Sequence, residues 1–206
     1  MPTLLPDGPR TGPPRCHLAP VTAYARIVTT TDRDLAADID ATCRLTGEFT
    51  LRSGQVSNEY FDKYLFEADP LLLARVAREM IQLVPHDTDL LGGLELGGVP
   101  LATSVSGILG RTPTLFVRKQ AKTYGTCKLA EGPDFAGKRV TLIEDVITTG
   151  GAVRDATNAL REGGAIVDVV ICAIDRSPAD QNPLEDVGLE VRAVLTKADL
   201  DAARAG

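Results

Sequence analysis

The spacing of apolar residues predicts a helix and then a β-hairpin in the first third of the chain. Residues 32–45 carry Leu35, Ile39 and Cys43 at four-residue spacing, which is typical of one amphipathic helix. Residues 49–64 alternate between apolar and polar positions around Ser53-Gly54, a pair that is typical of a tight turn. We therefore expect a hairpin over this second segment.

A second helix is expected to begin at Asp69. The Asp69 carboxylate can accept hydrogen bonds from the free N–H groups of a helix start, and Pro70 has the backbone angle of the first helical position. The buried face of this helix is expected to consist of the apolar residues at helical spacing, namely Leu73, Val76, Ala77, Met80 and Val84.

Short apolar runs predict five sheet strands in the rest of the chain, at residues 90–94, 114–117, 139–143, 166–174 and 191–195. Helices are expected between them at residues 99–109 and 151–161, the second ended by Gly163-Gly164. Strands that alternate with helices indicate an α/β fold with a central parallel sheet covered on both faces. In such folds the functional site lies at the carboxyl ends of the strands.

The first 28 residues differ in composition from the rest of the chain. Six of the 13 prolines fall within the first 20 positions, and proline fits neither a helix interior nor a central strand. We expect a disordered tail over residues 1–28, followed by one domain over residues 29–206.

Charge and cysteine content exclude several classes of protein. The net charge of −6 argues against a nucleic-acid partner, and no run approaches the roughly 20 apolar residues of a membrane span. No basic segment leads into an apolar signal core, so we expect a cytoplasmic protein with no membrane partner. The four cysteines are scattered and the two histidines lack zinc-ligand spacing, which favours free thiols over disulfides or structural zinc.

The most informative segment is residues 141–152, TLIEDVITTGGA. A buried strand is expected to end at the adjacent acids Glu144 and Asp145, before a small, hydroxyl-rich turn and a helix start. Free N–H groups at a helix start bind phosphate, and glycines let the backbone approach the anion. Two acids beside a phosphate cradle suit a ligand with sugar hydroxyls or bound Mg²⁺, such as a 5′-phosphorylated ribose. Neither a P-loop nor a dinucleotide fingerprint is present.

This segment resembles the motif that binds phosphoribosyl pyrophosphate (PRPP) in type I phosphoribosyltransferases. The resemblance implies that Glu144 and Asp145 bind the ribose hydroxyls, face the developing positive charge and contact Mg²⁺ indirectly, through water or ligand. It implies that the following turn holds the 5′-phosphate, through Thr148, Thr149, Gly150, Gly151 and Ala152. The alternative is an ordinary strand–turn–helix with acidic caps.

A basic segment follows the second sheet strand, at residues 116–126, FVRKQAKTYGT. Its cations Arg118, Lys119 and Lys122 resemble those of the catalytic loop RKxxKxHG of orotate phosphoribosyltransferases. The resemblance implies that they neutralise the leaving diphosphate, and that the loop closes over a neighbouring subunit in a homodimer. Tyr124 stands where many members have histidine, so a histidine role is excluded. A solvated basic loop is the alternative.

Two further segments resemble parts of the same family that bind the base. FTLRSGQVSNEYFDKY, residues 49–64, resembles a hairpin that forms a hood over the base, which implies Arg52 near the diphosphate and Tyr60 and Phe61 beside the base. AIDRSPAD, residues 173–180, implies that Arg176 holds the orotate carboxylate, and Thr148 is expected to reach the base as well. The alternatives are an amphipathic hairpin that packs into the core and a surface salt bridge from Asp175 to Arg176.

The segment LELGGVP, residues 94–100, departs from the family pattern. Gly97 and Gly98 can present N–H groups to a diphosphate, but many members have lysine in place of Gly97, so one expected cation is missing. The resemblance also implies an unusual backbone at Glu95–Leu96, such as a cis peptide.

Together these resemblances imply a type I phosphoribosyltransferase fold, with a hood from residues 29–66 and the C-terminal segment. The implied reaction transfers a phosphoribosyl group from PRPP to orotate with Mg²⁺, giving orotidine 5′-monophosphate and diphosphate in pyrimidine nucleotide biosynthesis. Two alternatives remain open, a phosphoribosyltransferase for another base and a PRPP-sensing regulator without catalysis.

Overall fold

The computed structural model describes residues 32–51, 54–119, 129–179 and 181–205; the expected tail at residues 1–28 lies outside them. The body of the protein is a six-stranded sheet in the order β5-β4-β3-β6-β7-β8. All neighbouring strands are parallel except β4 and β5. The strands are β3 (Leu90–Leu94), β4 (Thr114–Val117), β5 (Ala130–Glu131), β6 (Val140–Ile147), β7 (Val169–Asp175) and β8 (Glu190–Thr196).

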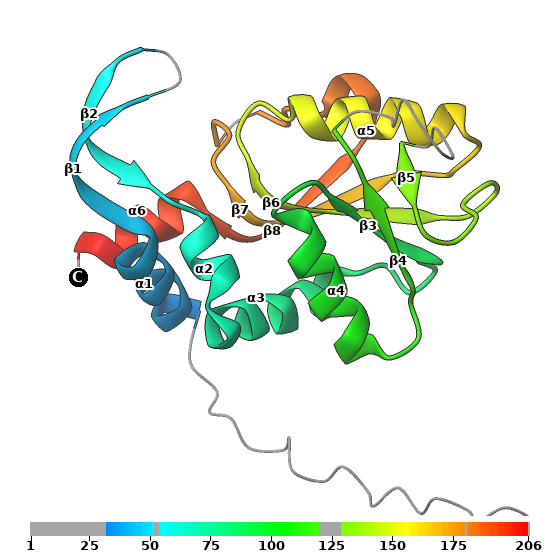
Figure 1. Ribbon diagram of the computed structural model, residues 1–206, viewed down its shortest axis with the longest axis horizontal. Helices are drawn as coiled ribbons and strands as arrows, with labels where there is room; N and C mark the ends of the chain where they lie inside the picture. The colour runs from blue at the N-terminus through cyan, green and yellow to red at the C-terminus, as the bar shows by residue number, and fades with distance from the viewer. Residues whose placement is uncertain (1–31, 52–53, 120–128, 180, 206) are drawn as a thin grey trace, which may run out of the picture.

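Helices cover both faces of this sheet, as expected (Figure 1). α3 (Pro70–Leu83) and α4 (Gly98–Leu109) lie on one face, and α5 (Gly151–Glu162) on the other. The reason is visible in α5, where Val153, Ala156, Thr157 and Leu160 are spaced at helical intervals and are all buried. Each face of the sheet therefore has its own apolar core.

The strand order places a crevice in the middle of the sheet. From β3 the chain proceeds outward to β4 and β5, whereas from β6 it proceeds the other way to β7 and β8. The segments that follow β3 and β6 therefore separate, one leading into α4 and the other into α5. Ligands bind at such a reversal point in open α/β sheets.

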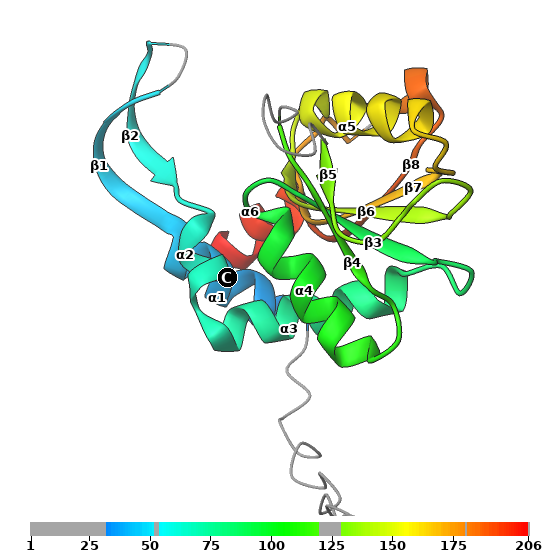
Figure 2. The same cartoon turned by 45° about the vertical axis from the view of Figure 1, so that its right-hand side comes forward.

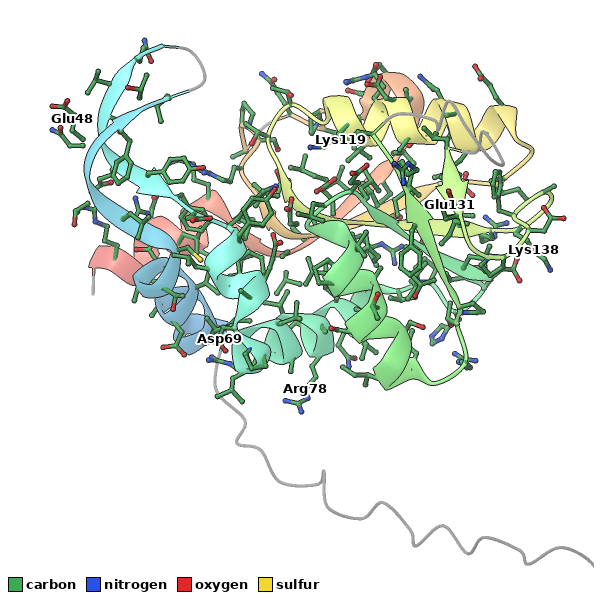
Figure 3. The ribbon with its side chains drawn as sticks, in the orientation of Figure 1. Glu48, Asp69, Arg78, Lys119, Glu131 and Lys138 are labelled. Carbon is green, nitrogen blue, oxygen red and sulfur yellow. The ribbon has the colours of Figure 1, made fainter. Side chains whose placement is uncertain are left out.

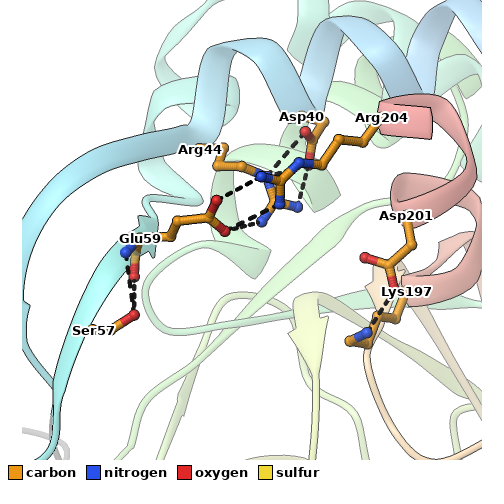
Figure 4. A network of polar contacts seen from close by, with 7 residues as sticks. All are labelled: Asp40, Arg44, Ser57, Glu59, Lys197, Asp201 and Arg204. Carbon is orange, nitrogen blue, oxygen red and sulfur yellow. Dashed lines mark hydrogen bonds and ion pairs between the residues drawn. The ribbon is translucent and has the colours of Figure 1, made fainter. Parts of the chain in front are cut away.

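The hairpin forms a separate two-stranded sheet that projects from the body (Figures 1 and 2). Its strands are β1 (Arg44–Thr50) and β2 (Val56–Phe61), which pair antiparallel. At its foot lie α1 (Asp32–Cys43), α2 (Tyr64–Ala68) and α6 (Lys197–Ala205). We call the ion pairs that join these elements the hairpin-foot network, formed by Asp40, Arg44, Glu59 and Arg204 (Figure 4).

Several expected boundaries were wrong. The first helix ends at Cys43 because the hairpin begins at once, at Arg44, five residues earlier than expected. The strand expected over residues 139–143 continues to Ile147, since its pairing with β7 extends to Asp175, so both acids lie within the strand. Residues 166–168 precede β7.

Burial in α3 also differs from the expected pattern. Leu72 is buried with Val76, Ala77 and Met80, while Leu73 and Val84 are only half-buried at the edge of the core. Asp69 caps α3 as expected, accepting hydrogen bonds from the N–H groups of Leu71 and Leu72. The sequence did not predict β5, α2 or α6, which are short or weakly patterned. Among the described residues, no helix is long and apolar enough to cross a membrane.

Candidate active site

Strand β6 brings Glu144 and Asp145 into the middle of the molecule. Glu144 is 7% exposed and Asp145 is fully buried. The Asp145 N–H donates to Glu144 Oε1 at 3.0 Å, and the Val146 N–H donates to Asp145 Oδ1 at 2.5 Å. The two carboxylates are thus fixed by the backbone of their own strand.

Two side chains from α2 and its N-cap reach the same place. Lys63 Nζ lies 2.5 Å from Asp145 Oδ2 in an ion pair. Glu67 is buried, and its Oε1 has no hydrogen-bond donor around it in the described part of the chain. If Glu67 carries a proton, its carboxyl can donate a hydrogen bond to Asp145, and the buried oxygen then has a partner. Sequence reasoning missed both residues; the signal was an ionisable pair four residues apart on either side of the apolar Leu65 and Phe66, in the segment KYLFE.

The protonation of the three acids follows from these contacts. Burial and the hydrogen bond to Asp145 raise the pKa of Glu67 to about 8, and the same causes raise the pKa of Glu144 well above its usual range. Burial alone would also raise the pKa of Asp145, but hydrogen bonds from Glu144 and Lys63 and the charge of Lys63 outweigh it and lower that pKa. Asp145 is therefore the carboxylate that stays ionised.

After β6 the chain makes the expected small turn. Thr148 and Thr149 are exposed, and Gly150 has a φ of 70°, in the left-handed region that favours glycine. A Cβ at Gly150 would also lie 2.7 Å from the Leu184 side chain, so both the backbone angle and this close contact favour glycine here. α5 begins at Gly151 and leaves its first N–H groups directed toward the turn.

The turn, Glu144 and one of the predicted cations line a single cavity of about 290 Å³, whereas Asp145 is fully buried and does not line it. Its lining residues come from four separate segments of the chain: Lys63, Tyr64, Glu95, Leu96, Lys119, Glu144 and residues 146–153. The grouping of Glu144, Thr148–Ala152 and Lys119 around one cavity is what the sequence predicted.

The segment after β3 closes one side of this region. The peptide between Glu95 and Leu96 is cis, which confirms the unusual backbone that the resemblance implied. Glu95 Oε2 accepts a hydrogen bond of 3.0 Å from the Lys119 N–H, which joins this segment to the end of β4. Gly97 and Gly98 are buried, and they lie against Asp145 and the backbone of β6 respectively.

The predicted cations are only partly described. Lys119 is exposed where β4 ends, on the side of the sheet that carries α5 (Figure 3). Arg118 is half-buried and lines a neighbouring cavity of about 720 Å³ together with Lys119 and Glu95. Lys122 and Arg52 lie outside the described residues, so their predicted roles stay predictions.

Two of the residues predicted to bind the base, Phe61 of the hairpin and Arg176 after β7, are in contact. The Arg176 guanidinium is 5.4 Å from the centre of the Phe61 ring, and the ring centres of Tyr60 and Phe49 are 5.5 Å apart. Asp175 accepts a hydrogen bond from the Ser177 N–H, so Asp175 and Arg176 engage different partners. Tyr60 is 44% exposed, whereas Phe61 is half-buried and packs against the core, so the alternative of a hairpin that packs its aromatic side chains into the core holds for Phe61 but not for Tyr60.

Comparison with known proteins places these features in one family. The family model described as the phosphoribosyl transferase domain matches residues 66–191. The chain is 78% identical over 175 residues to the orotate phosphoribosyltransferase of Nocardioides sp. (strain ATCC BAA-499 / JS614), covering 85% of this chain and 97% of that protein. It is 42% identical over 154 residues to that of Halobacterium salinarum, covering 75% of this chain and 87% of that protein.

Solved structures agree with this similarity. The crystal structure of Mycobacterium tuberculosis orotate phosphoribosyltransferase in complex with PRPP superposes with a TM-score of 0.70 at 32% identity, covering 83% of this chain and 99% of that one. The complex of the same enzyme with Fe(III) dicitrate gives a TM-score of 0.73 at 34% identity, covering 82% and 99%. The expected central sheet flanked by helices is thereby confirmed as the fold of these enzymes.

Proposed function

This chain belongs to the orotate phosphoribosyltransferases, PRPP-dependent enzymes of pyrimidine biosynthesis, and from that membership we propose which of its residues carry out the transfer to orotate. The observation that carries the proposal is the shared cavity, because Glu144 of β6, the turn before α5 and Lys119 surround one space, and Asp145 is paired with Lys63 at its wall. A sugar that carries a phosphate at one end and a diphosphate at the other needs these three kinds of group together.

The turn over residues 148–152 binds the 5′-phosphate of PRPP. The first N–H groups of α5 and the exposed hydroxyls of Thr148 and Thr149 supply the hydrogen-bond donors. Gly150 and Gly151 have no side chain to keep the anion away from the backbone, and Ala152 adds only a methyl group. Thr148 stands nearest to the acids along the chain and is proposed to reach the base as well.

Glu144 and Asp145 bind the ribose, and their different protonation states give them different roles. Asp145, whose pKa is lowered, presents a negative charge to the ribose as positive charge develops there. Glu144, whose pKa is raised, can donate as well as accept a hydrogen bond at the sugar hydroxyls. Two neighbouring carboxyls with opposite pKa shifts are a common arrangement in enzyme sites.

The same acids fit a magnesium ion that PRPP brings with it. Carboxylate oxygens are ligands that Mg²⁺ prefers, and Mg²⁺ usually keeps several waters beside one or two carboxylates and the substrate phosphates. In the described part of the chain no group of three or more ionisable side chains could hold a metal by itself. Glu144 and Asp145 would therefore contact the ion through water or ligand. When bound, the ion would neutralise charge on the diphosphate.

The leaving diphosphate is neutralised by cations near the end of β4. Arg118 and Lys119 lie there, and the proposal adds Lys122 and Arg52 from the sequence resemblance. We propose that the N–H groups of Gly97 and Gly98, which follow the cavity-lining Leu96, assist in binding the diphosphate. Following the family pattern, we propose a homodimer in which this basic loop closes over the neighbouring subunit.

Orotate is held beside the hairpin. The planar guanidinium of Arg176 can give two hydrogen bonds to the orotate carboxylate. Tyr60 and Phe61 provide aromatic surface for the flat base, and Phe61 already packs against Arg176.

The experiment mixes the purified protein with PRPP, Mg²⁺ and orotate and follows the loss of orotate absorbance together with diphosphate release. A Lys122→Ala variant should lose about 10²–10³ in kcat. The exposed Lys138, at the far end of the sheet, gives the matched control Lys138→Ala, which should keep full activity.

Each other outcome would correct a part of the proposal. Full activity of Lys122→Ala would remove that lysine from the mechanism. Diphosphate release with another base but not with orotate would discard the role of Arg176. Tight PRPP binding without turnover of any base would indicate a regulator.

A further inference from the structure

The position of Gly97 has no room for the lysine that many relatives carry there. A Cβ added to Gly97 would lie 1.8 Å from Asp145 Oδ2 and 2.5 Å from Glu67 Oε1. Both contacts are far below the separation of non-bonded atoms. The space beside Gly97 is therefore already filled by side chains from β6 and α2.

Lys63 brings an ammonium group to this same space from a different part of the chain. Its Nζ lies 2.5 Å from Asp145 Oδ2, the oxygen that a Cβ at Gly97 would strike. Lys63 also lines the cavity that holds Glu144, Lys119 and the phosphate turn. The side chain is one-third exposed, so it is open to a ligand in that cavity.

The acids around Lys63 keep its ammonium group charged. Three carboxyls, Glu67, Glu144 and Asp145, meet beside a single ammonium group in the described part of the chain. Burial by itself would lower the pKa of Lys63, but the hydrogen bond with Asp145 and the charges of Asp145 and Glu144 raise it. Lys63 is therefore a firmly charged group at the ligand side of the cavity.

We propose that Lys63 is a PRPP-binding residue, which supplies from the N-cap of α2 the positive charge that the family pattern places at position 97. In the free protein Lys63 pairs with Asp145 and keeps this carboxylate in place. When PRPP binds, the ammonium group lies between Asp145 and the diphosphate end of the ligand. The inference rests on the proposed roles of Glu144 and Asp145 at the ribose.

Glu67 acts as a positioning residue in this arrangement. It lies four residues after Lys63 and packs, buried, against the space at Gly97. Asp145 and Glu67 occupy the volume that the glycine at position 97 leaves empty, and Lys63 pairs with Asp145, so these four residues form one unit.

The test compares Lys63→Met, Lys63→Arg and Lys197→Met in steady-state kinetics. Lys197 forms a surface ion pair with Asp201, so its loss controls for the removal of a paired lysine elsewhere. For Lys63→Met we expect the KM for PRPP to rise roughly 10–100-fold, the range for a lost hydrogen bond to a charged group, while the KM for orotate stays unchanged. Lys63→Arg should recover most of the loss, and Lys197→Met should behave as the wild type.

A merely structural lysine would give different results. An unchanged KM for PRPP in Lys63→Met, or an arginine variant as poor as the methionine variant, would overturn the proposal. Asp145→Asn run in parallel separates the two levels of inference. If Asp145→Asn keeps full activity, the proposed roles of the acids fail; if it loses activity while Lys63→Met does not, the role of Lys63 alone fails.

A second measurement needs no variant and so does not depend on folding. The wild-type protein is acetylated briefly with and without PRPP and Mg²⁺, and modification of each lysine is read by mass spectrometry. PRPP should protect Lys63 but leave the exposed Lys138 and Lys197 as reactive as before. Equal modification of Lys63 in both samples would contradict direct contact.

Discussion

Two groups of charged side chains in this protein use the same residue types but balance them differently. The hairpin-foot network pairs two arginines, Arg44 and Arg204, with two acids, Asp40 and Glu59 (Figure 4). The second group, which we call the acid cluster, sets the three acids Glu67, Glu144 and Asp145 against Lys63. The first group is neutral within itself, whereas the second keeps an excess of negative charge unless protons or a ligand offset it.

The pKa shifts follow this difference. In the hairpin-foot network, hydrogen bonds from Arg204 and Arg44 lower the pKa of Glu59, and the hydrogen bond to Asp40 raises that of Arg44, so these two groups are held in their charged forms. In the acid cluster the pKa values of Glu67 and Glu144 are raised, so two groups are held neutral. A complete set of pairs stabilises a fold, and an incomplete one is typical of a site that binds a ligand.

The largest effect should come from breaking the acid cluster at Asp145. For Asp145→Asn we expect kcat/KM to fall about 10²–10³-fold, because a charge that faces the ribose in the transition state is lost. Stability should fall much less, since Glu144 or Glu67 can ionise beside Lys63. Steady-state kinetics and urea unfolding of the same preparation measure both quantities. A loss of stability as severe as the loss of activity would show that the cluster is structural.

The opposite pattern, a loss of stability rather than of activity, is expected when Arg44 is replaced in the hairpin-foot network. Arg44→Met leaves Asp40, which is only 7% exposed, without its partner, and should lower the free energy of unfolding by about 1–3 kcal/mol. Arg204→Met is the matched control, because Glu59 keeps its bond to Arg44 and the loss should be below about 1 kcal/mol. Equal losses in urea unfolding would show that burial of Asp40 does not matter.

The pH dependence of stability should distinguish the acid cluster from the hairpin-foot network without any ligand. The pKa of Glu67 in the folded protein, about 8, lies above that of the unfolded chain, so between about pH 4.5 and 8 the folded protein binds a proton that the unfolded chain has released. Rising pH therefore destabilises the protein across this window, with a slope of up to about 1.4 kcal/mol per pH unit for one proton.

The Glu67→Gln variant should flatten this decline, as measured by urea unfolding at several pH values in metal-free buffer. The pKa of Glu144 is also raised, so a reduced slope remains in the variant. If the wild type and Glu67→Gln decline in parallel, Glu67 does not hold a proton in the folded protein.

The smallest effect is expected at an isolated surface pair. Lys197 and Asp201 are both more than half exposed, and they stand four residues apart on α6. Lys197→Ala should change the unfolding free energy by no more than about 0.5 kcal/mol. A larger loss would mean that exposed pairs of α6 support the hairpin, and the contrast with Arg44 would then disappear.

Local patterns predicted much of the fold and part of the site. The strand, acids, turn and helix of residues 141–152 follow one another in the chain, so adjacency alone placed Glu144 beside Thr148. The central strands β3, β6 and β7 were found because parallel strands buried on both faces are almost wholly apolar. The edge strand β5, with two residues, has too short a pattern to be recognised.

The sequence could not predict what distant segments build together. Lys63 and Asp145 are far apart in the chain, and nothing in either segment shows that α2 packs beside β6. Gly97 was interpreted as the loss of a cation, because the volume that surrounds a residue is a property of tertiary packing. Arg176 and Phe61, by contrast, were both predicted at the base through separate resemblances, and the structure places them in contact. Their binding of orotate stays a prediction.

The close packing at Gly98 limits how this enzyme can evolve. A Cβ there would lie 2.2 Å from the carbonyl oxygen of Ile143, which is backbone and cannot rotate away. A lost charge at Lys63 can be replaced by a basic residue elsewhere along the cavity, so compensating mutations have many starting points. A side chain added at position 98 has no such remedy, and only reversion to glycine would restore the site. Few substitutions in this segment are therefore compatible with the site, even though the charged residues around it can be exchanged.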